Sequence, residues 1–203
     1  MASEPQAIAE TAAAIKRGEL VVFPTDTVYG VGTNAFDEDA ILCLYTIKRR
    51  SLGKGIPILL SDLIYLEEVA SSIPAIAREL MERFWPGPLT LIVPRHANLP
   101  RSVSDNDGVA VRIPDCDLTR AVIRAAGGAV ATSSANLSGH APAQSAEQAF
   151  MELTEDVSIV LDGGPSDQPM ASTIIDCRGA RPRILRQGPI KAVELKLFEK
   201  SNE

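Results

Sequence analysis

Short apolar runs and amphipathic helical stretches alternate irregularly along the chain, and this pattern limits the possible folds more than any other feature. The runs with strand character lie at 20–23, 56–60, 89–93, 109–113, 129–131, 158–161, 173–176 and 183–185. The helical stretches lie at 3–18, 37–47, 118–126 and 145–153, and Asp62 and Pro74 open two more. This irregular order predicts an α/β fold with a twisted mixed sheet, parallel and antiparallel, and flanking helices.

The length and composition are those of one globular domain. The chain has 203 residues, of which 45% are hydrophobic and 23% charged, and no linker, repeat or low-complexity tract divides it. A chain of this size buries about 70% of the surface that its unfolded form exposes, so it needs no disulfide or metal to fold. We expect a single domain over 1–203, with its core at about 5–190 and a short tail at 191–203.

Cysteine and histidine residues are too few and too dispersed for the common metal and hydrolase sites. Cys43, Cys116 and Cys177 form no CxxC pair, and His96 and His140 stand apart from any G-x-S-x-G sequence. Dispersed cysteines in odd number favour a reducing compartment. The sequence contains neither a secretory signal nor a long apolar run. We expect a cytoplasmic protein with no membrane segment, metal site or prosthetic group.

Two glycine-rich nucleotide motifs fail on their context. The segment 30–35, GVGTNA, matches G-x-G-x-x-A, but residues 24–29 separate it from the preceding strand and no acidic residue lies between Asp39 and Asp62. The pair Gly53-Lys54 is followed by Gly55 instead of a hydroxyl residue, which excludes a Walker loop. The sequence therefore predicts neither a Rossmann fingerprint nor a P-loop.

Charge is distributed unevenly. The formal net charge of −6 argues against a protein that coats nucleic acid by bulk electrostatics. Four segments free of carboxylates, at 40–61, 83–104, 118–146 and 177–193, nevertheless hold 14 of the 20 Lys and Arg residues. Two interpretations stay open: chance clustering on solvated helix faces, or a cationic site assembled from distant segments of an acidic chain.

Several loops that follow strands or helices carry groups suited to polyphosphate. Lys48 and Arg50 fall at the expected end of a helix, where the macrodipole favours cations, and they precede the glycine turn that holds Lys54. The segment 132–139, TSSANLSG, follows a short strand and is either a capped turn or a ligand loop at a strand end. Segments 23–27 and 184–188 also lead from strands into turns that carry polar side chains.

Seven segments together resemble the YrdC-like family. In order, they are 24–30 (PTDTVYG), 48–50 (KRR), 85–90 (WPGPLT), 109–114 (VAVRIP), 134–139 (SANLSG), 172–173 (ST) and 185–188 (LRQG). Lys48, Arg50, Ser134 and Asn136 meet the K-x-R and S-x-N signature of that family. The resemblance implies a YrdC/RibB-like fold with a concave, positively charged groove.

The resemblance also implies an activity. It is that of an L-threonylcarbamoyladenylate synthase, a nucleotidyltransferase that makes threonylcarbamoyl-AMP and pyrophosphate from L-threonine, bicarbonate and ATP, for N6-threonylcarbamoyladenosine in tRNA. Mg²⁺ would arrive with ATP, and no catalytic nucleophile is required. The residues implied for ATP are Lys48, Arg50, Ser134, Asn136, Ser138 and Arg186. Those implied for threonine are Thr25, Arg112, Thr132 and Ser172.

The chain departs from many relatives at two positions. Ser51 stands where they have proline, and Leu59 where they have a histidine near threonine, which bears on selectivity for the threonine hydroxyl. The chain resembles the short form of the family, whose product would pass to a separate tRNA threonylcarbamoyl-transferase complex. The alternative is a non-catalytic RNA- or nucleotide-binding protein of the same fold, with tRNA or double-stranded RNA as partner. As exposed cations, Lys48 and Arg50 are expected to matter for turnover and little for folding.

Overall fold

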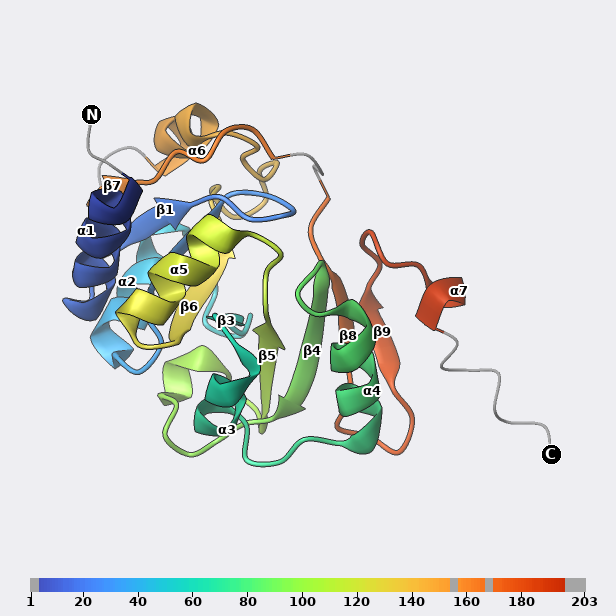
Figure 1. Cartoon of the computed structure of the whole chain (residues 1–203). Coiled ribbons are helices and arrows are strands. Elements are labelled where there is room, and N and C mark those ends of the chain that lie inside the picture. Colours follow the sequence, from blue (N-terminus) through green and yellow to red (C-terminus); the bar gives the residue numbers. More distant parts are fainter. Residues whose placement is uncertain (1–3, 154–156, 167–169, 196–203) are drawn as a thin grey trace.

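The computed structural model describes residues 4–153, 157–166 and 170–195. Within these ranges nine strands form one sheet in the order β7-β1-β2-β6-β3-β5-β4-β8-β9 (Figure 1). The strands are β1 (Val21–Phe23), β2 (Gly30–Asn34), β3 (Ile58–Leu60), β4 (Leu89–Pro94), β5 (Gly108–Arg112), β6 (Ala129–Ser134), β7 (Ile159–Val160), β8 (Thr173–Asp176) and β9 (Arg183–Arg186). The α-helices are α1 (Glu4–Lys16), α2 (Glu38–Ile47), α3 (Leu66–Val69), α4 (Ala75–Phe84), α5 (Asp117–Ala126), α6 (Ala146–Leu153) and α7 (Ala192–Leu195). Two short 3₁₀ helices are η1 (Leu63–Tyr65) and η2 (Arg101–Val103).

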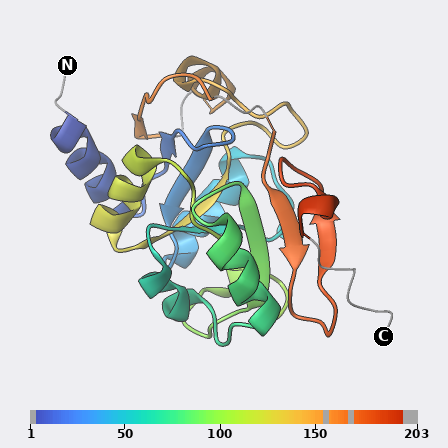
Figure 2. The same cartoon turned by 45° about the vertical axis from the view of Figure 1, so that its right-hand side comes forward.

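The sheet is mixed, as the irregular order of elements predicted. The pairs β1–β7, β3–β5 and β4–β8 are parallel, and the other five neighbouring pairs are antiparallel. Figures 1 and 2 show α1 and α5 side by side against one part of the sheet, and β8 and β9 at its opposite edge. The prediction of an α/β fold with flanking helices is confirmed.

Alternate residues of the central strands enter two separate cores. Ile58 and Leu60 of β3 belong to the larger core, together with residues of α2, α3, α4 and α6, whereas Leu59 joins the smaller core with α1 and α5. Successive side chains of a strand point to opposite faces, so the two cores lie on opposite faces of the sheet. Helices α1 and α5 cover only the part of their face near β1, β3 and β6. The rest of that face is not covered by these helices and forms the floor of a cleft.

Strand β2 was not predicted from the sequence. It pairs antiparallel with β1 and with β6, which makes it a central strand although two of its five residues are glycine. A Cβ atom at Gly32 would lie 2.8 Å from the carbonyl oxygen of Ala131 on β6. Glycine therefore allows a close approach of backbone here, in a strand.

Other expected elements differ in extent. The run at 56–60 pairs only over Ile58–Leu60, and the helix expected after Asp62 divides into η1 and α3. Asp37 caps α2 as expected, because its side chain accepts from the backbone N–H of Ala40 at 3.0 Å. Residue 3 of the first expected helix and residues 196–203 of the expected tail lie outside the described residues.

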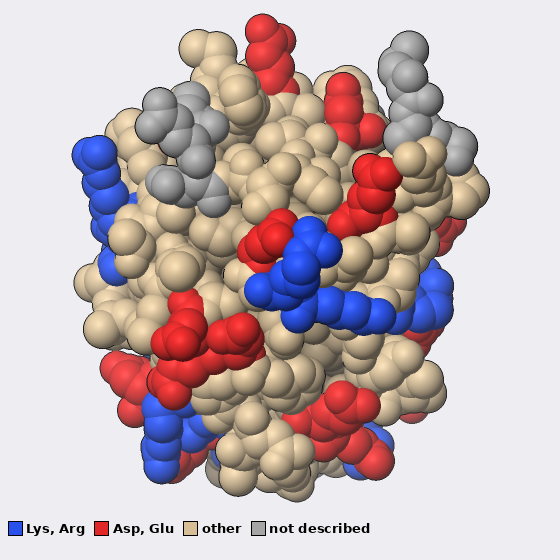
Figure 3. Space-filling model, turned by 90° about the vertical axis from the view of Figure 1, so that its left-hand side faces the viewer, with Lys and Arg blue, Asp and Glu red and all other residues tan. Residues whose placement is uncertain are grey.

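Side chains of both signs are interspersed on the surface shown in Figure 3. Arg17 and Glu19, for example, form an exposed ion pair at 2.6 Å. Across residues 4–153, 157–166 and 170–195, no helix combines the length and the hydropathy that crossing a bilayer requires.

Candidate functional site

One cleft of about 670 Å³ brings the predicted site residues together. Its floor continues the sheet face that α1 and α5 cover elsewhere, because Leu59, Ala110 and Thr132 line it while their strand neighbours enter the larger core. The lining includes every residue that the family resemblance implied for ATP or threonine, and also Lys54; these are Thr25, Lys48, Arg50, Lys54, Arg112, Thr132, Ser134, Asn136, Ser138, Ser172 and Arg186.

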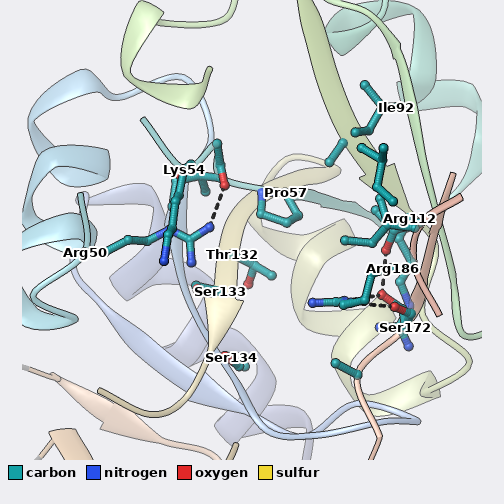
Figure 4. A pocket seen from close by; sticks show the side chains of 18 of the residues that line it. Arg50, Lys54, Pro57, Ile92, Arg112, Thr132, Ser133, Ser134, Ser172 and Arg186 are labelled. Atoms are coloured by element: carbon teal, nitrogen blue, oxygen red, sulfur yellow. Dashed lines mark hydrogen bonds between the residues drawn. The ribbon is translucent and has the colours of Figure 1, made fainter. Parts of the chain in front are cut away.

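Cationic side chains enter the cleft from two sides. Arg50 and Lys54 come from the turn after α2, and Arg186 comes from β9 on the other side, with Thr132 between them (Figure 4). Burial lowers the pKa of Arg186 from its ordinary value, and the positive charges of Arg112 and Arg50 lower it further. Cations that destabilise one another in this way would be relieved by a bound polyanion.

The turn that follows α2 is held by its own hydrogen bonds. Arg49 has a positive φ of 48°, which is the left-handed conformation with which helices commonly end. Arg50 donates from Nε to the carbonyl of Lys54 at 3.1 Å and from Nη2 to that of Gly55 at 2.9 Å. The hydroxyl of Tyr45 donates to the Lys54 carbonyl at 3.0 Å. These contacts fix the direction of the Arg50 guanidinium and leave its Nη1 without a hydrogen-bond partner among the described residues.

Arg112 is fixed beneath the cleft by three acceptors. Its Nε donates to the carbonyl of Gly87 at 2.9 Å, its Nη1 to the hydroxyl of Thr27 at 3.0 Å, and its Nη2 to the carboxylate of Asp26. Arg112 is 6% exposed, and burial lowers its pKa from the ordinary value even though Asp26 favours the charged form. One N–H of each terminal nitrogen is left over for a ligand carboxylate.

The hydroxyl groups of the site are of two kinds. Thr25 is occupied within its own turn, since its Oγ1 donates to the carbonyl of Val28 at 2.6 Å and accepts from the backbone N–H of Thr27 at 3.2 Å. Ser172 shares a 2.7 Å hydrogen bond with Thr90 and accepts from Nη2 of Arg186 at 3.2 Å. Thr25 therefore shapes the turn after β1, whereas Ser172 links Thr90 of β4 to the Arg186 side chain.

Lys48 is buried, contrary to the expectation that it is an exposed cation. Its residue is 1% exposed, and Nζ donates to the backbone carbonyls of Ser134 and Asn136. Burial lowers the pKa of Lys48 to about 8, and the charge of Arg50 adds to the effect. The expectation failed because a helix end was assumed to face solvent, whereas the loop after β6 packs over this one.

The loop after β6 has further braces. Asn136 donates from Nδ2 to the carbonyls of Leu137 at 2.8 Å and His140 at 2.9 Å. Glu152 on α6 accepts from the backbone N–H of Leu137 at 3.0 Å and contacts the His140 ring at the same distance. The backbone hydrogen bond from Leu137 lowers the pKa of Glu152. These contacts support the loop in the shape in which Ser134 and Ser138 line the cleft.

Sequence reasoning gave no role to Asp26 or Thr90, which lie in segments that it singled out. Asp26 pairs with Arg112, 86 residues away, and Thr90 pairs with Ser172, 82 residues away. Neither contact could be derived from spacing along the chain. Leu59 lies beside Arg112 in the register of β3 and β5 and lines the cleft. Its apolar side chain forms part of the cleft wall, at one of the two positions where the sequence departs from many relatives.

No group of three or more His, Cys, Asp or Glu side chains gathers in the described chain in a way that could hold a metal ion. The carboxylates that line the cleft are Asp105 and Asp176, and Asp176 is paired with Arg178 at 2.8 Å. This donor set fits a Mg²⁺ ion that is held mainly by substrate phosphates.

Comparison with known proteins relates the chain to one family. The Sua5/YciO/YrdC family model, described as telomere recombination, matches residues 13–188. A Mycobacterium tuberculosis protein provisionally named threonylcarbamoyl-AMP synthase is 43% identical over 184 residues, which cover 90% of this chain and 84% of that protein. The threonylcarbamoyl-AMP synthase of Bacillus subtilis is 40% identical over 190 residues, which cover 93% of this chain and 55% of that protein.

Two solved structures share the fold. Sua5 of Pyrococcus abyssi in complex with L-threonine is 35% identical with a TM-score of 0.92, and the match covers 97% of this chain and 58% of that one. YciO of Escherichia coli gives a TM-score of 0.85 at 23% identity, and the match covers 96% of this chain and 95% of that one. The chain thus spans little more than half the length of Sua5. With its mixed sheet, its cleft and its match over residues 13–188, this chain belongs to the Sua5/YciO/YrdC family.

Proposed function

We propose that this chain is an L-threonylcarbamoyladenylate synthase, a nucleotidyltransferase that forms threonylcarbamoyl-AMP and pyrophosphate from L-threonine, bicarbonate and ATP. The observation that carries the proposal is the cleft of about 670 Å³, in which cations suited to phosphates face hydroxyls and a buried arginine suited to an amino acid. The names of the B. subtilis and M. tuberculosis relatives and the threonine complex of the P. abyssi relative support it.

The cations on the two sides of the cleft are proposed to hold ATP. Arg50 and Arg186 neutralise phosphate charge from opposite sides, and Ser134, Asn136 and Ser138 place the loop after β6 against the nucleotide. Lys48 is proposed to serve the same nucleotide through this loop, because its Nζ donates to the carbonyls of Ser134 and Asn136. Mg²⁺ would enter with the phosphates and neutralise part of their charge.

Arg112 is proposed to bind the carboxylate of threonine with its two unused N–H groups. Thr25, Thr132 and Ser172 line the same cleft, and Ser172 accepts a hydrogen bond from Arg186. Threonine would therefore lie beside the phosphates. Attack of N-carboxythreonine on the α-phosphate then needs positioning and charge stabilisation, and no nucleophile from the protein.

The product would serve the N6-threonylcarbamoyladenosine modification of tRNA. Threonylcarbamoyl-AMP would leave the cleft for a separate tRNA threonylcarbamoyl-transferase complex, and binding of tRNA or double-stranded RNA by this chain belongs to the same proposal. We place the reaction in the cytoplasm.

Pyrophosphate release from ATP and Mg²⁺ tests the activity. It is expected to require both threonine and bicarbonate, and threonylcarbamoyl-AMP should be found by mass spectrometry. Pyrophosphate release that is independent of threonine, or no pyrophosphate release at all, would reject the proposal that the chain is a synthase. Salt-dependent binding of tRNA without any turnover would instead support the alternative, a non-catalytic RNA- or nucleotide-binding protein of this fold.

A further inference from the structure

The ammonium group of Lys48 lies at the centre of the loop after β6. Nζ donates to the carbonyl of Ser134 and, at 2.5 Å, to that of Asn136, and the carbonyl of Lys48 itself accepts from the backbone N–H of Ser138 at 3.0 Å. Residue 48 ends α2, so these three contacts tie the helix to the loop. Side chain and backbone of one residue thus hold both ends of the segment 134–138.

Burial and hydrogen-bond capacity limit what this ammonium can bind. It has three N–H donors, and two of them are used by backbone carbonyls. Because Lys48 as a residue is only 1% exposed, its ammonium must be hydrogen-bonded inside the protein, since burial of an unpaired charge is very costly. At most one donor is left for a phosphate oxygen.

The two carbonyls also depend on Lys48. Their oxygen atoms converge on Nζ from positions 134 and 136, and both carry partial negative charge. Without a cation between them they would repel each other and leave acceptors unsatisfied inside the protein. The loop shape seen in the structure therefore requires the ammonium before any ligand binds.

We propose that Lys48 is a positioning residue, which shapes the 134–140 loop through the carbonyls of Ser134 and Asn136, and is not primarily a ligand of the ATP phosphates. Its importance for turnover rests on the proposed function, because the loop presents Ser134 and Ser138 to the cleft. Its effect on the loop does not rest on that function.

Arg50 is the matched control, because it enters the same cleft through different contacts. Its guanidinium donates to the carbonyls of Lys54 and Gly55, and among the described residues it makes no hydrogen bond to the loop after β6. Loss of Arg50 should weaken ATP binding and leave the free loop unchanged. Loss of Lys48 should change the loop even when no ligand is present.

Amide hydrogen exchange of the ligand-free protein distinguishes these roles. In Lys48→Met, which keeps the apolar stem, exchange at 136–140 should become roughly tenfold to a hundredfold faster, whereas Arg50→Ala should match the wild type. Unchanged protection of the loop in Lys48→Met, together with weakened ATP binding like that of Arg50→Ala, would overturn the proposal.

A measurement on the wild-type protein covers the case in which Lys48→Met fails to fold. The ¹H–¹⁵N spectrum of lysine ammonium groups in the ligand-free protein should contain one slowly exchanging signal with nuclear Overhauser contacts to the segment 134–136. Absence of that signal would refute the proposal. Neither experiment uses turnover, so a chain without synthase activity could still pass both.

Discussion

Asp26 and Arg112 form an ion pair beneath the cleft in which the side chains are 13% and 7% exposed. Asp26 follows β1, whereas Arg112 is the last residue of β5. Thr27 and Gly87 complete the environment of the guanidinium. The orientation of Arg112 is therefore set by the turn after β1, and it exists before threonine binds.

Asp26→Asn should destabilise the fold. The substitution leaves the buried Arg112 charge without its counter-ion, which costs about 3–5 kcal/mol for pairs of this kind. Urea unfolding monitored by circular dichroism measures the loss. Asp62→Asn is the control, because Asp62 pairs with the half-exposed Arg124 and should cost less than about 1 kcal/mol. Equal losses for the two variants would contradict the importance of burial at Asp26.

ATP binding should take up a proton above pH 8. The pKa of Lys48 is about 8 in the free protein, so part of the population is neutral there, and phosphate charge near the ammonium raises the pKa. Proton uptake on binding means that ATP affinity falls as the pH rises through 8. Calorimetry at about pH 8.5 in two buffers with different heats of ionisation measures the uptake. The same heat in both buffers would exclude it, and Lys48→Met should give that result.

Arg186→Ala should lower kcat/KM by roughly 10²–10³, because a preorganised cation that faces developing charge is lost. The fold should remain intact, because Arg186 lies on the edge strand β9 and its side chain belongs to neither apolar core. Steady-state pyrophosphate release measures the effect. Arg181 is exposed in the β8–β9 connection outside the cleft lining, and Arg181→Ala should retain full activity. A similar loss in both variants would point to general electrostatics instead of a specific site.

Gly188→Ala should destabilise the wall of the cleft. A Cβ atom at Gly188 would lie 2.4 Å from the carbonyl oxygen of Ala171 and from the backbone nitrogen of Thr173, so the backbone around Ser172 must move. A cost of roughly 1–3 kcal/mol in the free energy of unfolding is expected. Gly179→Ala is the control, since its nearest contact would be an ordinary 3.5 Å. Thermal melts of the two variants should differ clearly, and coincident melts would contradict the steric argument.

The sequence predicted most of the elements and the mixed character of the sheet, because apolar periodicity and capping residues such as Asp37 act locally. It missed β2, since a strand with glycine at Gly30 and Gly32 has little intrinsic strand preference and is stabilised by its two neighbours. The motifs led to the residues of the cleft, but the burial of Lys48 and its carbonyl contacts depend on a loop 86 to 88 residues away.

The position of β9 in the chain has a consequence for synthesis on the ribosome. Arg186 lies on a strand that pairs only with β8, whereas the opposite side of the cleft is built by residues near 50 and 134. Most of the sheet can form as the polypeptide emerges, but the cleft has one side missing until the β8–β9 hairpin has left the exit tunnel. High affinity for a polyanion should thus be acquired only after β9 has emerged.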